Sequence, residues 1–270
     1  MKVSIENRKS MKMLKYPLCA LMLTLAAGSA EAQVAMDLIF DYPSYLRDEQ
    51  THARVAIRND TDRLLLVGGL RGAVTLEFRI MSNDRNIPRT SGGLMVENAI
   101  IMPGQVREVI VDLRSHFNIQ PAGQYQVTAS VAMGRQNFLS PRRVIDVVPG
   151  IELLSAKMAV PGYPARVRSY SLRYWNRKDR DELFLSASDE KEGMSCGVLH
   201  LGPLVRFMSP EITIDADGSI RTKHQCASDR IAYTALKSTI NGVSFVGQET
   251  KRIEKPPLPR PGIPANPKSK

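Results

Sequence analysis

Two cysteines and two histidines in the C-terminal half of the chain form an arrangement that could carry metal or redox chemistry. His200 follows Cys196 by four positions, and Cys226 follows His224 by two. Residues two and four positions apart on an extended strand share a face, so neighbouring strands could bring the four side chains together. Two cysteines and two histidines suit a tetrahedral zinc ion. Their spacings match no common zinc module, so we expect no metal and favour a disulfide between the cysteines.

The first 32 residues predict a secretory signal peptide. A basic stretch ends at Lys15, an apolar run covers residues 17–27, and the small-x-small triplet at residues 30–32 is typical of a cleavage site. The run is much shorter than the roughly 20 residues that cross a bilayer, so we expect no transmembrane segment. The mature protein is therefore expected to be exported, periplasmic or extracellular. Cys19 would leave with the leader, and the remaining cysteine pair would lie in an oxidising compartment that favours a disulfide.

A surface for a ligand is predicted where basic and aromatic residues occur together. Arg173, Tyr174, Trp175 and Arg177 adjoin a charged turn, and cationic and aromatic side chains together could bind a glycan or an acidic polymer. The alternative interpretation is a charged turn that is simply solvated.

Catalytic motifs are absent from the sequence. It contains no Gly-x-Ser-x-Gly elbow, phosphate loop, His-Glu-x-x-His or dinucleotide fingerprint, and only four histidines. We therefore expect a protein that is not an enzyme and needs no cofactor. A hydrolase that uses Asp and Glu pairs stays open as a minor alternative.

The charge distribution argues against nucleic-acid binding. Lys and Arg exceed Asp and Glu by 37 to 27, a net charge of +10. The first 32 residues hold five basic and two acidic residues, and residues 251–270 hold six basic and one acidic, which leaves only +2 for residues 33–250. A nucleic-acid-binding domain concentrates its positive charge on a folded face. We expect an envelope protein or an anionic polymer as the partner.

Period-two alternation predicts strands throughout the chain, and we find no long helical pattern. Residues 74–80 are the clearest case, because apolar and polar side chains alternate and would lie on opposite faces of a sheet. Similar runs predict strands at about 36–42, 53–58, 94–101, 106–113, 124–132, 142–148, 170–175, 183–187, 196–207, 211–216, 219–226, 230–237 and 243–249. Asp217-Gly218 and Asn241-Gly242 predict hairpin turns.

A resemblance appears at Pro121-Ala-Gly-Gln-Tyr125, which opens an alternating strand after a turn. This segment resembles the corner between the fifth and sixth strands of immunoglobulin-like and fibronectin type III-like domains, in which Tyr125 would be the corner tyrosine. Val127 stands where antibody domains have their second core cysteine, and residues 34–149 contain no tryptophan. The resemblance therefore implies a structural role for Tyr125 and a β-sandwich over residues 34–149, without a known ligand.

We expect an all-β protein with two β-sandwich-like domains in tandem. The predicted units are a signal peptide (1–32), an immunoglobulin-like sandwich (33–149), a second β-rich domain (150–250) and a basic, proline-rich, disordered tail (251–270). Prolines at 149, 161 and 164 mark the expected junction between the domains. The favoured function is a non-enzymatic binding or structural protein of the cell envelope. The alternative is a periplasmic chaperone or enzyme inhibitor that acts through a strand edge or loop. The oligomeric state is left open.

Overall fold

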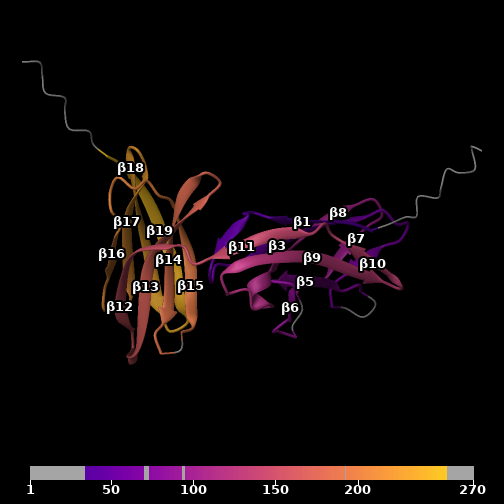
Figure 1. Ribbon diagram of the computed structural model, residues 1–270, viewed down its shortest axis with the longest axis horizontal. Helices are drawn as coiled ribbons and strands as arrows, with labels where there is room; N and C mark the ends of the chain where they lie inside the picture. The colour runs from indigo at the N-terminus through magenta and orange to yellow at the C-terminus, as the bar shows by residue number, and fades with distance from the viewer. Residues whose placement is uncertain (1–33, 70–72, 93–94, 192, 254–270) are drawn as a thin grey trace, which may run out of the picture.

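The computed structural model describes residues 34–69, 73–92, 95–191 and 193–253. These residues form nineteen strands and one 3₁₀ helix, η1 (Leu113–Ser115), which confirms the predicted all-β fold. Among them, no helix is long and apolar enough to span a membrane. The predicted signal peptide and most of the predicted tail lie outside the described residues. Figure 1 shows two lobes, with the strands of one running along the long axis of the molecule and those of the other running across it.

The N-terminal lobe, residues 34–148, contains two sheets and a short ribbon. The first sheet has the order β1-β3-β8, and the second has the order β2-β11-β9-β5-β6, with β10 also paired to β9 and β2 parallel to β11. The ribbon pairs β4 with β7. The strands are β1 (Val34–Phe40), β2 (Ser44–Leu46), β3 (His52–Asn59), β4 (Leu65–Val67), β5 (Leu76–Ser82), β6 (Arg85–Ile87), β7 (Ala99–Ile101), β8 (Val106–Asp112), β9 (Gly123–Met133), β10 (Gln136–Leu139) and β11 (Arg143–Val148).

Alternation explains the core of this lobe. On β9, the side chains of Tyr125, Val127, Ala129 and Val131 are all buried, whereas the residues between them are more exposed. The same pattern on β3 buries every second residue. The inward faces of the two sheets thus supply one continuous hydrophobic cluster, as expected for a sandwich.

The C-terminal lobe, residues 151–253, consists of two four-stranded antiparallel sheets, with the orders β12-β13-β14-β15 and β16-β17-β18-β19. A second hydrophobic cluster lies between them and includes Leu172 and Leu185 from the first sheet and Ile220 and Leu236 from the second. The strands are β12 (Ile151–Val160), β13 (Tyr163–Arg177), β14 (Arg180–Asp189), β15 (Ser195–Pro203), β16 (Glu211–Ile214), β17 (Ser219–Ala227), β18 (Arg230–Thr239) and β19 (Gly242–Arg252).

The short strands β2, β4, β6 and β10 were not predicted from the sequence, and the structure differs from the expectation at three further places. Strand β12 fills most of the segment that was expected to be a junction. Register shifts between Glu152 and Leu154 and between Ala159 and Val160 leave only a short alternating run within it. The strand expected at residues 94–101 is only the three-residue β7. Strand β19 continues into the predicted tail as far as Arg252, which pairs with Arg230 of β18.

Only Pro149 and Gly150 connect β11 to β12, and this link brings the lobes into contact. Gly150 has a φ of +68°, in the left-handed region that favours glycine. A Cβ atom at this position would lie 2.4 Å from Cδ2 of Leu46. Glycine is therefore required here both for the backbone conformation and for the close approach of β2.

Candidate functional site between the lobes

The predicted ligand surface on β13 is divided by the alternation of that strand. Tyr174 faces the C-terminal core together with Leu172, and its hydroxyl accepts a hydrogen bond from Nη1 of Arg206 at 3.0 Å. Arg173, Trp175 and Arg177 occupy the alternate positions and therefore lie on the opposite face of the sheet. That face is turned toward the N-terminal lobe, so the four residues do not form one surface.

Arg177 is buried in the joint between the lobes. Its side chain is 2% exposed and forms an ion pair with Glu49 of the N-terminal lobe. The guanidinium group lies 4.3 Å from the ring centre of Tyr42 and 4.7 Å from that of Phe184. Cation–π contacts of this kind are strengthened by burial. Arg177 therefore cannot reach a ligand while the lobes are joined, and it acts as a clamp between them.

Trp175 and Arg173 complete the joint. Nε1 of Trp175 donates a hydrogen bond to Oγ of Ser44 at 3.1 Å. Arg173 donates to the carbonyl oxygen of Pro149 at 3.0 Å and forms an ion pair with Glu152 at 2.7 Å. Trp175 and Arg177 thus hold one lobe against the other, whereas Arg173 braces the link and β12.

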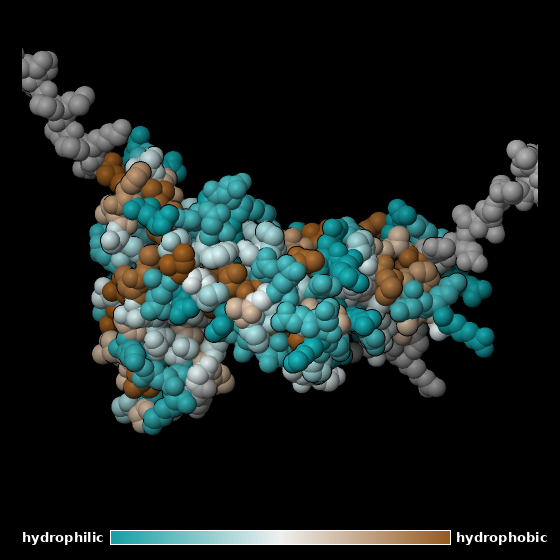
Figure 2. Space-filling view, viewed as in Figure 1, coloured by the Kyte–Doolittle hydropathy of each residue, from teal (hydrophilic) through white to brown (hydrophobic). Residues whose placement is uncertain are grey.

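A groove runs beside this joint and takes its walls from both lobes. Its main pocket has a volume of about 460 Å³ and is lined by residues of both lobes: Leu46, Arg47, Asp48, Asn118, Gln120, Pro121, Pro149, Arg173, Ser186, Ser188, Gly193 and Val198. A second pocket of about 390 Å³ shares Asp48 and Val198 with it and extends the groove toward the start of β15. In the space-filling view the lobes meet at a re-entrant corner (Figure 2).

Five side chains in the main pocket are free to bind a ligand. Arg47, Asn118, Gln120, Ser186 and Ser188 make no side-chain hydrogen bond or ion pair with any other described residue. Guanidinium, amide and hydroxyl groups in one hollow can bind carboxylate and hydroxyl oxygens. The groove therefore has the chemistry of a polar binding site.

The free charge in the groove is positive. Asp48 is neutralised by Arg114, with the ion-pairing atoms 3.1 Å apart. Arg173 is similarly balanced by Glu152. Arg47 is exposed and has no such partner among the described residues, so its charge is available to an anionic group.

Tyr125 supports the wall of the groove from behind. Its ring is 2% exposed, and its hydroxyl donates a hydrogen bond to the carbonyl oxygen of Pro121 at 2.7 Å. Burial raises the pKa of Tyr125, and the nearby charge of Arg47 opposes this effect. The tyrosine therefore stays protonated. Its hydrogen bond holds the turn that contains Pro121, and Pro121 lines the groove.

The two cysteines are free thiols, and the disulfide expected between them is not formed. Cys196 lies at the start of β15, where its carbonyl oxygen is close to Gly242 in the β18–β19 turn. Cys226 lies at the end of β17, beside Arg230 at the opposite end of β18. The ten residues of β18 span about 30 Å. The Cα atoms of a disulfide lie within about 7 Å of each other, so two cysteines at opposite ends of β18 are too far apart to form one.

The histidines also have separate environments. His200 forms a hydrogen bond through Nε2 with Glu182 at 2.8 Å and lies against the ring of Phe184. His224 is buried in the C-terminal core. Within the part of the chain that the structure describes, no group of three or more His, Cys, Asp and Glu residues could hold a metal ion.

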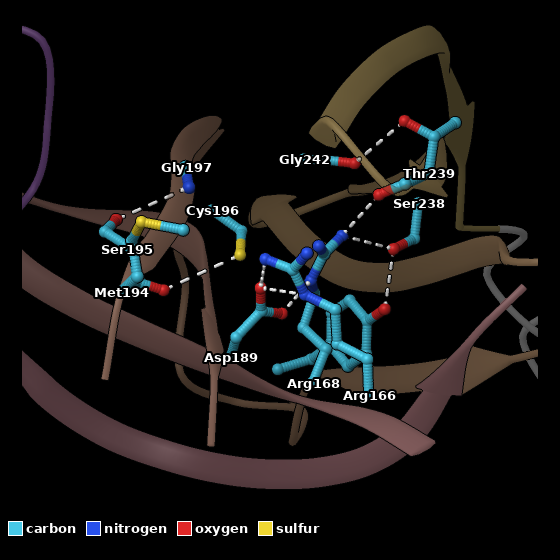
Figure 3. A network of polar contacts seen from close by, with 11 residues as sticks. Arg166, Arg168, Asp189, Met194, Ser195, Cys196, Gly197, Ser238, Thr239 and Gly242 are labelled. Carbon is cyan, nitrogen blue, oxygen red and sulfur yellow. Dashed lines mark hydrogen bonds and ion pairs between the residues drawn. The ribbon is translucent and has the colours of Figure 1, made fainter. Parts of the chain in front are cut away.

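A buried polar network links the two sheets of the C-terminal lobe (Figure 3). Nε of Arg168 donates to Oδ1 of Asp189 at 2.8 Å, and its Nη1 donates to Oγ of Ser238 at 2.9 Å and to the carbonyl oxygen of Thr239 at 2.7 Å. Arg168 is fully buried. Because β13 and β18 belong to different sheets, this arginine fastens one sheet to the other.

Cys196 lies next to this network, and the network suppresses its reactivity. Burial raises the pKa of Asp189, but hydrogen bonds from Arg168 and Arg166 outweigh that effect and hold the pKa below its usual value. Burial and the neighbouring Asp189 carboxylate raise the pKa of the Cys196 thiol. A thiol that stays protonated is a poor nucleophile, so Cys196 is a structural residue here.

Of the four residues that the sequence predicted as a ligand surface, Arg173 lines the groove, but sequence reasoning missed the other residues that line it. Arg47, Asn118 and Gln120 lie outside strands and resemble ordinary solvated loop residues. Ser186 and Ser188 alternate with apolar residues on β14, so they could be assigned to the outward face but not to a pocket. The groove forms only when the lobes meet, and a pattern within one strand cannot show this. Comparison with known proteins finds no matching protein family and no matching curated sequence.

Proposed function

We propose that this chain is an exported, non-enzymatic binding protein of the cell envelope and that the groove between its lobes is the ligand site. The observation that carries this proposal is the set of five unpartnered polar side chains that both lobes contribute to one pocket. Binding sites are concave, and they often lie where two domains meet. The unbalanced charge of Arg47 favours a partner that presents carboxylates, either an anionic polymer or an acidic segment of an envelope protein.

The N-terminal lobe is proposed to be an immunoglobulin-like sandwich. Its sheets pair β1-β3-β8 and β2-β11-β9-β5-β6, and the antiparallel strands carry a short parallel pairing of β2 with β11. The hydrogen bond from Tyr125 to the carbonyl four residues upstream has the geometry of a tyrosine corner. This architecture is compatible with many functions, so the proposed binding role rests on the groove and not on the fold.

Export is part of the proposal and rests on the leader pattern in residues 1–32. We propose a periplasmic or extracellular location for the mature protein. The test is to express the full chain with a C-terminal tag in a bacterial host, fractionate the cells, and determine the N-terminus of the product. Removal of the leader supports export, whereas an intact N-terminus in the cytosol contradicts it.

A periplasmic chaperone or inhibitor is the second candidate, and strand β12 favours it. Among the described residues, this ten-residue strand pairs only with β13, so its outer edge has free backbone donors and acceptors. An extended client segment could add to such an edge. A proline at Ser155, in the middle of β12, would impair edge addition while leaving the groove intact.

The groove is tested by measuring how the purified mature protein binds to envelope fragments and to polyglutamate, a simple carboxylate polymer. We expect Arg47→Glu to weaken binding about tenfold or more, because it replaces an attractive charge by a repulsive one. Arg63→Glu is the matched control. Arg63 is also highly exposed, but it lies outside the groove.

The two variants separate the possible results. Loss of binding in Arg47→Glu together with normal binding in Arg63→Glu supports the groove as the site. Equal loss of binding in both variants would mean that the interaction depends only on the net charge of the protein, which would contradict a specific site. Binding that is insensitive to Arg47→Glu but abolished by Ser155→Pro would favour the chaperone candidate instead.

A further inference from the structure

The outer face of the sheet β16–β19 carries a second hollow, remote from the groove between the lobes. Its volume is about 480 Å³, and it lies across all four strands of the sheet. The outward side chains that line it come from two neighbouring rows: Thr213, Arg221, Ala235 and Gly247 in one row, and Glu211, Lys223, Tyr233 and Glu249 in the next. None of these residues lines the groove between the lobes.

The hollow exists because its floor is made of small residues. Ala235 and Gly247 are direct neighbours on β18 and β19, and Tyr233 stands beside them as a wall. Four strands spaced as in an ordinary sheet cover about 14 Å from the first to the last. The hollow is therefore long enough for a short chain of ring-shaped units laid across the strands.

Among the described residues, no steric contact requires glycine at position 247. Its φ is not in the left-handed region, and a Cβ atom built there would have no other atom within 4 Å. Glycine in the interior of a strand costs stability because it packs poorly and loses more backbone entropy on folding. Gly247 adjoins the register shift that β18 and β19 make between Ala235 and Leu236. Its missing side chain also keeps the space above the sheet open, which is a feature of sites where a ligand approaches closely.

The charges around the hollow are balanced. Lys223 pairs with Glu211 at 2.9 Å, and Arg221 pairs with Asp215 at 2.9 Å. Lys251 pairs with Glu249 at 2.8 Å. Each cation thus has its own carboxylate, so the site exerts little net attraction on a charged polymer. The paired groups nevertheless keep donors and acceptors that can bind hydroxyl groups.

We propose that this hollow binds a neutral oligosaccharide, a ligand class different from the anionic partner of the groove. Nζ of Lys251, one row beyond Tyr233 on β19, lies 5.1 Å from the ring centre of Tyr233. The C–H face of a sugar ring would pack on Ala235 and Gly247 and against the side of the Tyr233 ring next to them, because aromatic side chains offer a large apolar surface. Its hydroxyl groups would bind to the ion-paired side chains at the rim. A neutral ligand matches the balanced charge of the rim.

The test measures binding of neutral hexasaccharides of glucose and of N-acetylglucosamine to the mature protein by calorimetry. Gly247→Val places a branched side chain in the hollow at a position where an added Cβ atom has open space, and we expect it to weaken binding at least about tenfold. Tyr233→Ala should weaken binding similarly. The matched control is Gly92→Val, since a Cβ atom at Gly92 also meets nothing within 4 Å and its φ is likewise not left-handed.

The outcomes are decisive in either direction. Binding of a neutral hexasaccharide that is lost in Gly247→Val and retained in Gly92→Val supports the site, and a melting temperature of Gly247→Val no lower than that of the wild type shows that the variant is folded. No binding of either neutral hexasaccharide, or equal binding by the wild type and Gly247→Val, overturns the proposal. Arg47→Glu should leave this binding unchanged, which separates failure of the sheet site from failure of the groove.

Discussion

At the scale of single residues, His224 is a titratable side chain buried in the C-terminal lobe. It is 1% exposed, and neither ring nitrogen makes a hydrogen bond of standard geometry. Burial lowers the pKa of His224 to about 4, the nearby Pro203 carbonyl opposes this shift, and the positive charge of His200 adds to it. The imidazole is therefore neutral at pH 7, and its protonation would place an unpaired charge inside the C-terminal core.

We expect His224 to make the protein sensitive to acid. Because its pKa is lower in the folded state than in the unfolded state, stability is unaffected above about pH 6.5 and decreases as the pH falls toward 4. At pH 5 the loss is about 2 kcal/mol. Urea unfolding at pH 7 and pH 5 measures this loss, and the His224→Leu variant should lack most of it. An equal loss in the wild type and in His224→Leu would assign the acid sensitivity to other groups.

At the scale of elements, the sequence predicted most of the strands that alternate cleanly and missed those with interrupted patterns. Strands β5 and β9 were expected because their alternation is uninterrupted and one of their faces is buried. Strand β12 was missed because register shifts near both of its ends leave only a short alternating run. Strands β2, β4 and β6 have three residues each, too few to show a period. Short strands depend on partners that are distant in the sequence, as β2 depends on β11.

The candidate site was harder to predict than the fold. Basic and aromatic residues on β13 were predicted to form one surface, but the alternation of the strand divides them, and the N-terminal lobe covers Arg177. The disulfide was expected from the number of cysteines and the proposed compartment. Neither of these gives any information about the distance between Cys196 and Cys226. Contacts between lobes and distances along a sheet depend on topology, which a local pattern does not record.

The link between β11 and β12 offers a test at this scale. Gly150→Ala should destabilise the protein by more than the roughly 1 to 2 kcal/mol of a left-handed backbone, because the new methyl group would also collide with Leu46. Gly104→Ala is the matched control, since Gly104 has a similar φ of +74° but open space around it. Unfolding by urea measures both variants. Equal destabilisation would mean that Leu46 moves aside and that the joint is loosely packed.

At the scale of the whole molecule, the angle between the lobes depends on a small number of contacts around one arginine. Arg177 forms an ion pair with Glu49 and stacks on the ring of Tyr42. The side chains of Arg177 and Glu49 are both largely buried. Removing one member of a buried pair leaves the other charge without compensation, which is usually more costly than removing both. The groove takes its walls from both lobes, so its shape depends on this clamp.

We expect Arg177→Met to loosen the joint and to weaken ligand binding in the groove without unfolding either lobe. Each lobe has its own hydrophobic cluster, so the variant should retain its β-sheet circular dichroism but show a larger radius of gyration in solution scattering. Trp175, the only tryptophan in the chain, lies in the joint, and its fluorescence should shift to the red as the indole gains contact with water.

The double variant Arg177→Met with Glu49→Met distinguishes a clamp from a simple loss of charge. Because both partners are removed, no buried carboxylate is left unpaired, and the compact shape should return at least in part. Restored compactness with restored binding would show that the groove needs the joint rather than the arginine itself. A radius of gyration that is unchanged in Arg177→Met would contradict the clamp, and the rigidity of the joint would then have to come from Trp175 and the link at Gly150.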